Sequence, residues 1–266
     1  MGVLSARLQA LGIPFTLVYG VDGAKLGPSL LKRLRSRWQN LLMGAVLTEG
    51  ELGCYLSHLL VFETFLRTSQ SEYALVLEDD AALPEDLSAI CSWLTSHRPT
   101  ISFLTHGGFH GFARRSDELV NSRGPLSLYK SQRFPSVTAC YLISREYARL
   151  RRDHGMPMAA PVDYYRHLPG YRKCHHVVPM PVQVAPFASI IGQRPVSQEK
   201  SFSIRALFRE PMSSVPALLL KIKRIVLNRS FVACQLLLGW MTKKQRRALL
   251  ADVIDFDTLQ VRSAFK

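Results

Sequence analysis

The sequence lacks the cysteine spacings that mark a zinc ribbon or a disulfide framework. Its five cysteines are scattered along 266 residues, and no two are spaced C-x-x-C. This pattern is typical of reduced thiols in a cytoplasmic protein. The P-loop, the G-x-G-x-x-G fingerprint and the G-x-S-x-G elbow are also missing. Their absence argues against the common nucleotide-binding loops and the serine hydrolases.

Acidic residues and long apolar runs are scarce as well. There are 20 Asp and Glu against 34 Lys and Arg, a formal net charge of +14. That excess favours anionic partners such as nucleic acid, anionic lipid or phosphorylated substrates, without choosing among them. The longest uncharged stretches are too short or too interrupted by proline to span a bilayer. The first residues show neither a signal peptide nor a myristoylation pattern, so we expect a soluble or peripheral protein.

Helical and strand-like patterns follow one another along the chain and predict an α/β layered fold. Thr48 and Glu51 form a capping box before apolar residues at helical intervals, and residues 73–77 form a strand-like run. The sequence predicts further helices at 3–11, 84–97 and 145–155, and further strands near 13–23, 101–108, 127–134, 137–144 and 173–186. The run at 13–23 closes with a turn at Asp22-Gly23. We expect one domain at 1–193 and a mainly helical, basic extension at 194–266.

Two interpretations of this extension stay open. Lys and Arg residues flank the apolar runs ALLL and FVACQLLLGWM. Such a segment packs on the core with a solvated basic edge, or it lies on a membrane with Lys and Arg toward anionic lipid and Trp240 toward the acyl chains.

Three consecutive carboxylates, Glu78, Asp79 and Asp80, follow the strand-like run at 73–77. Adjacent negative charges repel one another unless water or a cation offsets them. One interpretation is a solvated turn or the N-terminal cap of the next helix. The other is a metal site, because Glu78 and Asp80 at alternate positions of an extended segment can share one Mg²⁺ or Mn²⁺. Such an ion would neutralise a diphosphate leaving group.

Several segments together resemble glycosyltransferase family 25, the bacterial lipopolysaccharide and lipo-oligosaccharide galactosyltransferases and their collagen-modifying relatives. They are LGIPFTLVYGVDGAKL, GELGCYLSHLLVFETFL, YALVLEDDAAL, VTACYLISREYA and PVDYYRHL, in that order and rough spacing. The resemblance implies a GT-A-like fold, a UDP-sugar donor (most often UDP-galactose), a divalent metal and inversion at the anomeric carbon. The bacterial branch implies a lipid-linked oligosaccharide acceptor and a place at the cytoplasmic face of the inner membrane.

The resemblance also implies roles for residues at matching positions. Glu78 and Asp80 would hold the metal, with Asp79 at the diphosphate. The donor would border four further residues: Asp22, Gly23, Ser57 and His58. An inverting transfer needs a carboxylate that takes the acceptor's proton, and Asp163 is the candidate for this general base. A helix cap is the other interpretation of Asp163.

One departure from the family bears on activity. Members usually open with a strand that contributes to the nucleotide site, whereas this sequence opens at the helix expected to follow it. We therefore keep as an alternative a catalytically inactive homologue that binds a glycan or a partner. A basic nucleic-acid-binding protein is a further alternative, but no strand interleaves aromatic and basic residues, and no nucleic acid is expected. His106, His110 and the run Cys174-His175-His176 show no complete zinc-ligand spacing.

Overall fold

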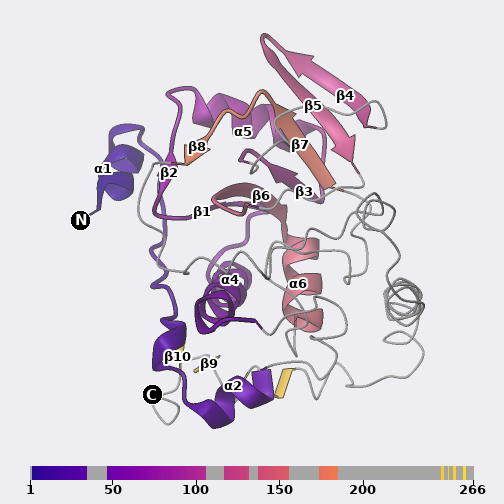
Figure 1. Ribbon diagram of the computed structural model, residues 1–266. Helices are drawn as coiled ribbons and strands as arrows, with labels where there is room; N and C mark the ends of the chain where they lie inside the picture. The colour runs from indigo at the N-terminus through magenta and orange to yellow at the C-terminus, as the bar shows by residue number, and fades with distance from the viewer. Residues whose placement is uncertain are drawn as a thin grey trace, which may run out of the picture.

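A computed structural model describes residues 2–34, 47–105, 117–131, 137–155 and 174–184, and in the C-terminal region 247–248, 251, 254–255 and 260–261. Its centre is a six-stranded sheet in the order β1-β6-β3-β7-β5-β4 (Figure 1). The strands are β1 Tyr73–Leu77, β6 Cys140–Ser144, β3 Ile101–Phe103, β7 Cys174–Val178, β5 Leu126–Ser131 and β4 Glu118–Arg123. Neighbouring strands are antiparallel except β3 and β7, which are parallel.

Helices cover both faces of this sheet. α4 (Glu49–Thr68) and α6 (Arg145–His154) lie on one face and α5 (Leu87–Ser96) on the other (Figure 1). Side chains of β6 alternate between the two resulting cores. Tyr141 and Ile143 join the cluster under α4, whereas Cys140 and Leu142 join the cluster under α5. The predicted α/β layering is confirmed.

The start of α4 follows from local sequence. Thr48 Oγ1 accepts a hydrogen bond from Glu51 N at 3.2 Å, and Glu51 Oε2 accepts one from Thr48 N at 2.8 Å. This capping box satisfies two N–H groups that the first turn leaves without helical partners. The predicted box and helix are confirmed, as is the strand at 73–77. The helix predicted at 145–155 is confirmed as α6, and its N-cap residue Ser144 accepts a hydrogen bond from Tyr147 N.

The strand predicted at 13–23 is wrong. Residues 13–22 are extended but pair with no strand in the described part of the chain. A strand needs a hydrogen-bonded neighbour, and β1 at the sheet edge pairs with β6 alone within that part. The turn at its end is a 3-10 helix, η1 (Gly23–Lys25), and the Asp22 side chain accepts a hydrogen bond from Ala24 N.

The sequence analysis missed two of the longer elements. α2 (Pro28–Leu34) lies in the basic segment and buries Leu30 and Leu34. β4 has mostly exposed, polar residues without alternation, so it gives no strand pattern, and it pairs with β5 across a turn at Gly124, φ 57°. The remaining elements are α1 Val3–Ala10 and the short pairs β2 Ala81–Ala82 with β8 Gln183–Val184 and β9 Ile254–Asp255 with β10 Gln260–Val261.

The predicted basic extension lies mostly outside the described residues, and so does Trp240. Arg247 joins it to the sheet domain, since its Nε donates to Asp153 Oδ1 of α6 at 3.0 Å and its Nη2 donates to Asp153 Oδ2 at 3.5 Å. Among the helices described, none combines the length and apolar character needed to cross a bilayer.

Candidate active site at the end of β1

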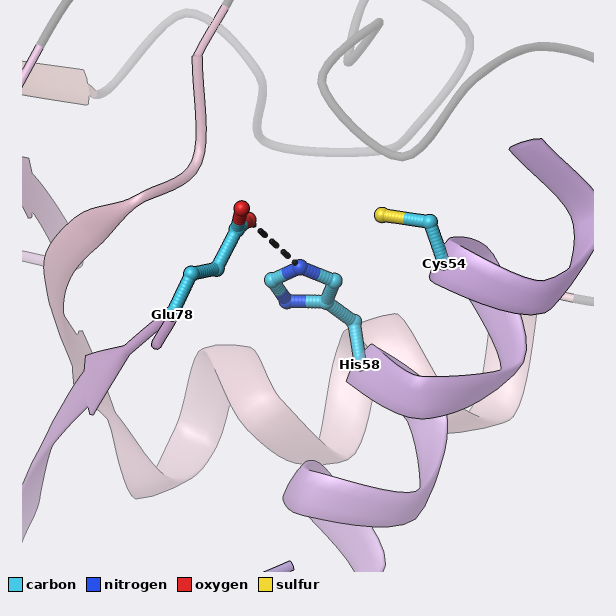
Figure 2. Close-up of side chains that lie close together, drawn as sticks. All are labelled: Cys54, His58 and Glu78. Carbon is cyan, nitrogen blue, oxygen red and sulfur yellow. Dashed lines mark hydrogen bonds and ion pairs between the residues drawn. The ribbon is translucent and has the colours of Figure 1, made fainter. Parts of the chain in front are cut away.

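Glu78, the first residue after β1, is held on several sides. Its backbone N–H donates to Ala139 O at 2.8 Å, which extends the pairing of β1 with β6 by one residue. Its Oε1 accepts a hydrogen bond from Thr138 Oγ1 at 2.5 Å and lies 3.2 Å from His58 Nε2 (Figure 2). The carboxylate is therefore fixed by α4 and by Thr138, two residues before β6.

His58 lies on the buried face of α4 and connects Glu78 to Tyr141. Its Nδ1 lies 2.7 Å from the Tyr141 hydroxyl, and the two rings stack with centroids 5.7 Å apart. An ionised carboxylate can only accept, so Nε2 donates to Glu78 and, in the neutral ring, Nδ1 accepts from Tyr141. The structure thus brings together two predicted site residues, His58 and Glu78, that are 20 positions apart.

Cys54 stands one helical turn before His58 and points toward the same space (Figure 2). The Cys54 thiol, a His58 ring nitrogen and a Glu78 carboxylate oxygen all lie within 4.8 Å of one another. Among the residues that the structure describes, they form a group of three side chains with the spacing of metal ligands.

Asp79 and Asp80 form a turn rather than a continuation of the strand. β1 ends at Leu77, and Ala81 N donates to Glu78 O at 3.2 Å across the turn. The extended geometry on which the predicted Glu78–Asp80 pair depended is therefore wrong. Asp79 is exposed, whereas Asp80 is partly buried and its Oδ1 has no hydrogen-bond partner among the described residues. The turn does not cap α5 either, since Asp86 occupies the N-cap position.

The two inner carboxylates differ in their electrostatics. Burial acts to raise the pKa of Glu78, but the hydrogen bond and charge of His58 and the hydrogen bond of Thr138 bring that pKa below its ordinary value. Burial raises the pKa of Asp80, and the charges of Glu78 and Asp79 raise it further. A cation would relieve this repulsion and give Asp80 Oδ1 a partner, so the acidic turn fits a hard divalent ion.

Ser57, the residue before His58 on α4, fixes the segment that carries Asp22. Its Oγ accepts a hydrogen bond from Val21 N at 2.8 Å and donates to Gly53 O at 2.8 Å. Asp22 is exposed, and besides its cap to Ala24 it lies 3.4 Å from Lys25 Nζ. No contact recorded among the described residues joins Asp22 to the acidic turn.

Gly23 and Gly53 allow this segment to lie directly on α4. A Cβ added at Gly23 would lie 1.7 Å from Glu49 O, and one added at Gly53 would lie 2.5 Å from Val21 O. No side chain fits at such separations, so these glycines are required by close backbone packing. This packing explains the glycine of the predicted Asp22-Gly23 turn without a nucleotide.

Comparison with known families decides the identity. The sequence profile of glycosyltransferase family 25 (LPS biosynthesis protein) matches residues 2–165. The chain belongs to glycosyltransferase family 25. It is a glycosyltransferase of lipopolysaccharide biosynthesis, with a sugar donor and an acceptor as its partners. A comparison with individual proteins of curated function found no match.

The family 25 match extends across the acidic turn, the helix α4 and Asp163. Asp163 itself lies outside the described residues, as do His106 and His110. Cys174 and His176 are buried in β7, where Cys174 donates to Ser131 O and His176 lies 3.7 Å from Asp117. These contacts give the β7 residues structural partners rather than a shared metal site.

Three side chains of the candidate site escaped the sequence analysis: Cys54, Thr138 and Tyr141. For Cys54 the signal was its i,i+4 spacing from His58 on a predicted helix, which puts both side chains on one face. Thr138 and Tyr141 stand 60 and 83 positions from their partners, so their roles depend on the pairing of β6 with β1.

Proposed function

We propose that this family 25 glycosyltransferase transfers a hexose, galactose by preference, from a UDP-sugar to a lipid-linked oligosaccharide of the lipopolysaccharide or lipo-oligosaccharide type. The reaction would depend on Mn²⁺ or Mg²⁺ and invert the anomeric centre. The observation that carries the proposal is the acidic turn at the end of β1, where the partly buried Asp80 has a raised pKa and an oxygen with no hydrogen-bond partner among the described residues. A diphosphate donor with its divalent ion would supply the missing positive charge.

In this proposal each residue of the turn has its own task. Glu78 and Asp80 would hold the cation, which stabilises the negative charge of the departing UDP. Asp79, the exposed member, would orient the diphosphate. The hydrogen bonds from Thr138 and His58 keep Glu78 ionised and in one orientation, so the ligand set needs little rearrangement when the donor binds.

The remaining residues would shape the donor and acceptor sides. Ser57 holds the backbone at Val21, which places Asp22 and Gly23 beside α4. Asp163 is the proposed general base for the acceptor hydroxyl, since the attacking oxygen must lose a proton as it displaces UDP. A cytoplasmic enzyme bound to the inner membrane through its basic extension would meet both a soluble donor and a lipid-linked acceptor.

The extended segment at 13–22 favours a second candidate function. It contributes no strand to the described sheet and leaves Leu17 and Tyr19 exposed. If this segment belongs to the donor site, a homologue could retain the acidic turn and bind a glycan or a partner without turnover.

Titration calorimetry of UDP with and without Mn²⁺ distinguishes the transferase from the inactive homologue. Metal-dependent binding to the wild type that Asp80→Asn loses would support the proposed donor site. Glu85→Gln is the matched control, because its side chain is 92% exposed and lies outside the turn. No UDP binding under either condition, or unchanged binding by Asp80→Asn, would contradict the proposal.

A further inference from the structure

We propose that Cys54, His58 and Glu78 form a binding site for a divalent transition-metal ion of the zinc type, distinct from the hard cation of the donor diphosphate. The proposal goes beyond the proposed transferase function and does not depend on it. Three ligand types that zinc accepts, a thiol, an imidazole and a carboxylate, converge from α4 and the end of β1 (Figure 2).

The geometry is close to that of a coordinated ion. Zinc binds nitrogen and oxygen at about 2.0–2.2 Å and sulfur at about 2.3 Å, so tetrahedral ligand atoms stand roughly 3.3–3.7 Å apart. His58 Nε2 and Glu78 Oε1 are already 3.2 Å apart. The Cys54 thiol, a His58 ring nitrogen and a Glu78 carboxylate oxygen all lie within 4.8 Å of one another, so a small side-chain shift would bring the three ligand atoms to coordination distances.

The surroundings of the three ligands support a metal more than an ordinary ion pair. Metal-binding histidines have a second partner that fixes the ring, and here Tyr141 lies at Nδ1. When Nε2 binds a metal, the ring proton moves to Nδ1, and the Tyr141 hydroxyl accepts from it instead of donating. Thr138 orients Glu78 in the same way, and His58 is buried on the rigid helix α4.

The ligand types decide which ion is expected. Thiolate and imidazole favour zinc and related transition metals, whereas Mg²⁺ and Mn²⁺ prefer carboxylate and water oxygens. Binding would release the thiol proton of Cys54 and leave one position of a tetrahedral ion for water. Thr138 and His58 both contact Oε1 of Glu78, so its Oε2 carries neither of these bonds and remains for the donor cation.

Cobalt(II) is the probe, because thiolate ligation gives a charge-transfer absorption that oxygen ligands do not. Titrating Co²⁺ into the metal-free 266-residue chain should produce this band with one equivalent, and Zn²⁺ should abolish it while excess Mg²⁺ should not. Cys54→Ser should lose the band. Cys91→Ser should retain the band and is the matched control. Like Cys54, Cys91 is partly buried and forms no disulfide bond, but it packs against the core under α5, on the other face of the sheet.

A graded effect is expected at the supporting residue. Tyr141→Phe should weaken zinc affinity by about 10–100-fold through the loss of a positioning contact, without removing the thiolate band at saturation. Circular dichroism of each variant confirms that it is folded. Absence of the band in the folded wild type, or its persistence in Cys54→Ser, would overturn the proposal.

Asp80→Asn separates this site from the donor site. The variant should keep the cobalt band even if it loses Mn²⁺-dependent UDP binding. Failure of the wild type to bind UDP, together with an intact cobalt band, would contradict the transferase proposal alone. Loss of the band in a folded Asp80→Asn protein would show one shared site and overturn the proposed separation.

Discussion

Ser57 and Val21, 36 positions apart, are joined by a hydrogen bond of 2.8 Å from the Val21 amide to the Ser57 hydroxyl. The same hydroxyl donates a hydrogen bond to Gly53 O of its own helix. This pair attaches the extended N-terminal segment to α4, one residue before His58 of the candidate site.

Ser57→Ala should loosen this segment. The Val21 amide loses its partner, and we expect the free energy of unfolding to fall by about 1–2 kcal/mol. Urea denaturation measures the loss, and hydrogen exchange should be faster at Val21. Ser92→Ala is the control, because Ser92 makes the same kind of bond to its own helix, is exposed and should change stability by less than about 0.5 kcal/mol. Equal effects of the two substitutions would contradict the assigned role.

Gly53→Ala should be more damaging than its size suggests. The added Cβ would meet Val21 O at 2.5 Å and Gly23 N at 2.7 Å, both backbone atoms that cannot move alone. We expect a loss of about 1–3 kcal/mol, measured by thermal or urea unfolding. Gly20→Ala in the same segment is the control, since its Cβ would meet Ser57 Oγ at an ordinary 3.7 Å. A tolerated Gly53→Ala would mean that the segment does not lie on α4 this closely.

Tyr141→Phe should destabilise the fold, whereas Tyr55→Phe should not. The Tyr141 hydroxyl is bonded to His58, so its removal leaves a buried ring nitrogen unpaired and costs about 1–3 kcal/mol. The Tyr55 hydroxyl is buried and has no hydrogen-bond partner among the described residues, so its removal should be neutral or stabilising. Both are measured by the shift in unfolding free energy. A destabilised Tyr55→Phe would reveal a partner for that hydroxyl.

Glu78 should make stability depend on pH in acid. Its pKa in the folded chain is lowered from the ordinary 4.5, so the folded state favours the ionised form. The resulting stabilisation is complete above the unfolded pKa and is lost as the pH falls through the folded pKa. Unfolding free energies of the wild type and Glu78→Gln, measured from about pH 6 to about pH 3, should therefore converge toward acid. A constant difference across that range would contradict the lowered pKa.

Local patterns explain which parts of the fold were predictable. The capping box at Thr48 and Glu51, the apolar face of α4 and the strand at 73–77 each depend on residues within a few positions of one another. The run at 13–23 had equally clear strand character, yet a strand also requires a neighbour in the sheet, and that requirement is not local. The opposite happened at β4, which the sequence did not predict. A polar, exposed strand forms because its partner β5 pairs with it, and its own residue pattern gives no sign of it.

The same distinction between local and non-local contacts applies to the candidate site. The sequence by itself determined the acidic residues after a buried strand, the helix that carries Cys54, Ser57 and His58, and the resemblance to family 25, because these lie in continuous segments. Only the tertiary structure decided that Glu78 binds His58 while Asp80 keeps an oxygen without a described partner, and that Thr138 and Tyr141 belong to the site. Those contacts exist because β6 pairs with β1 beneath α4, and such pairing is set by packing of the whole sheet.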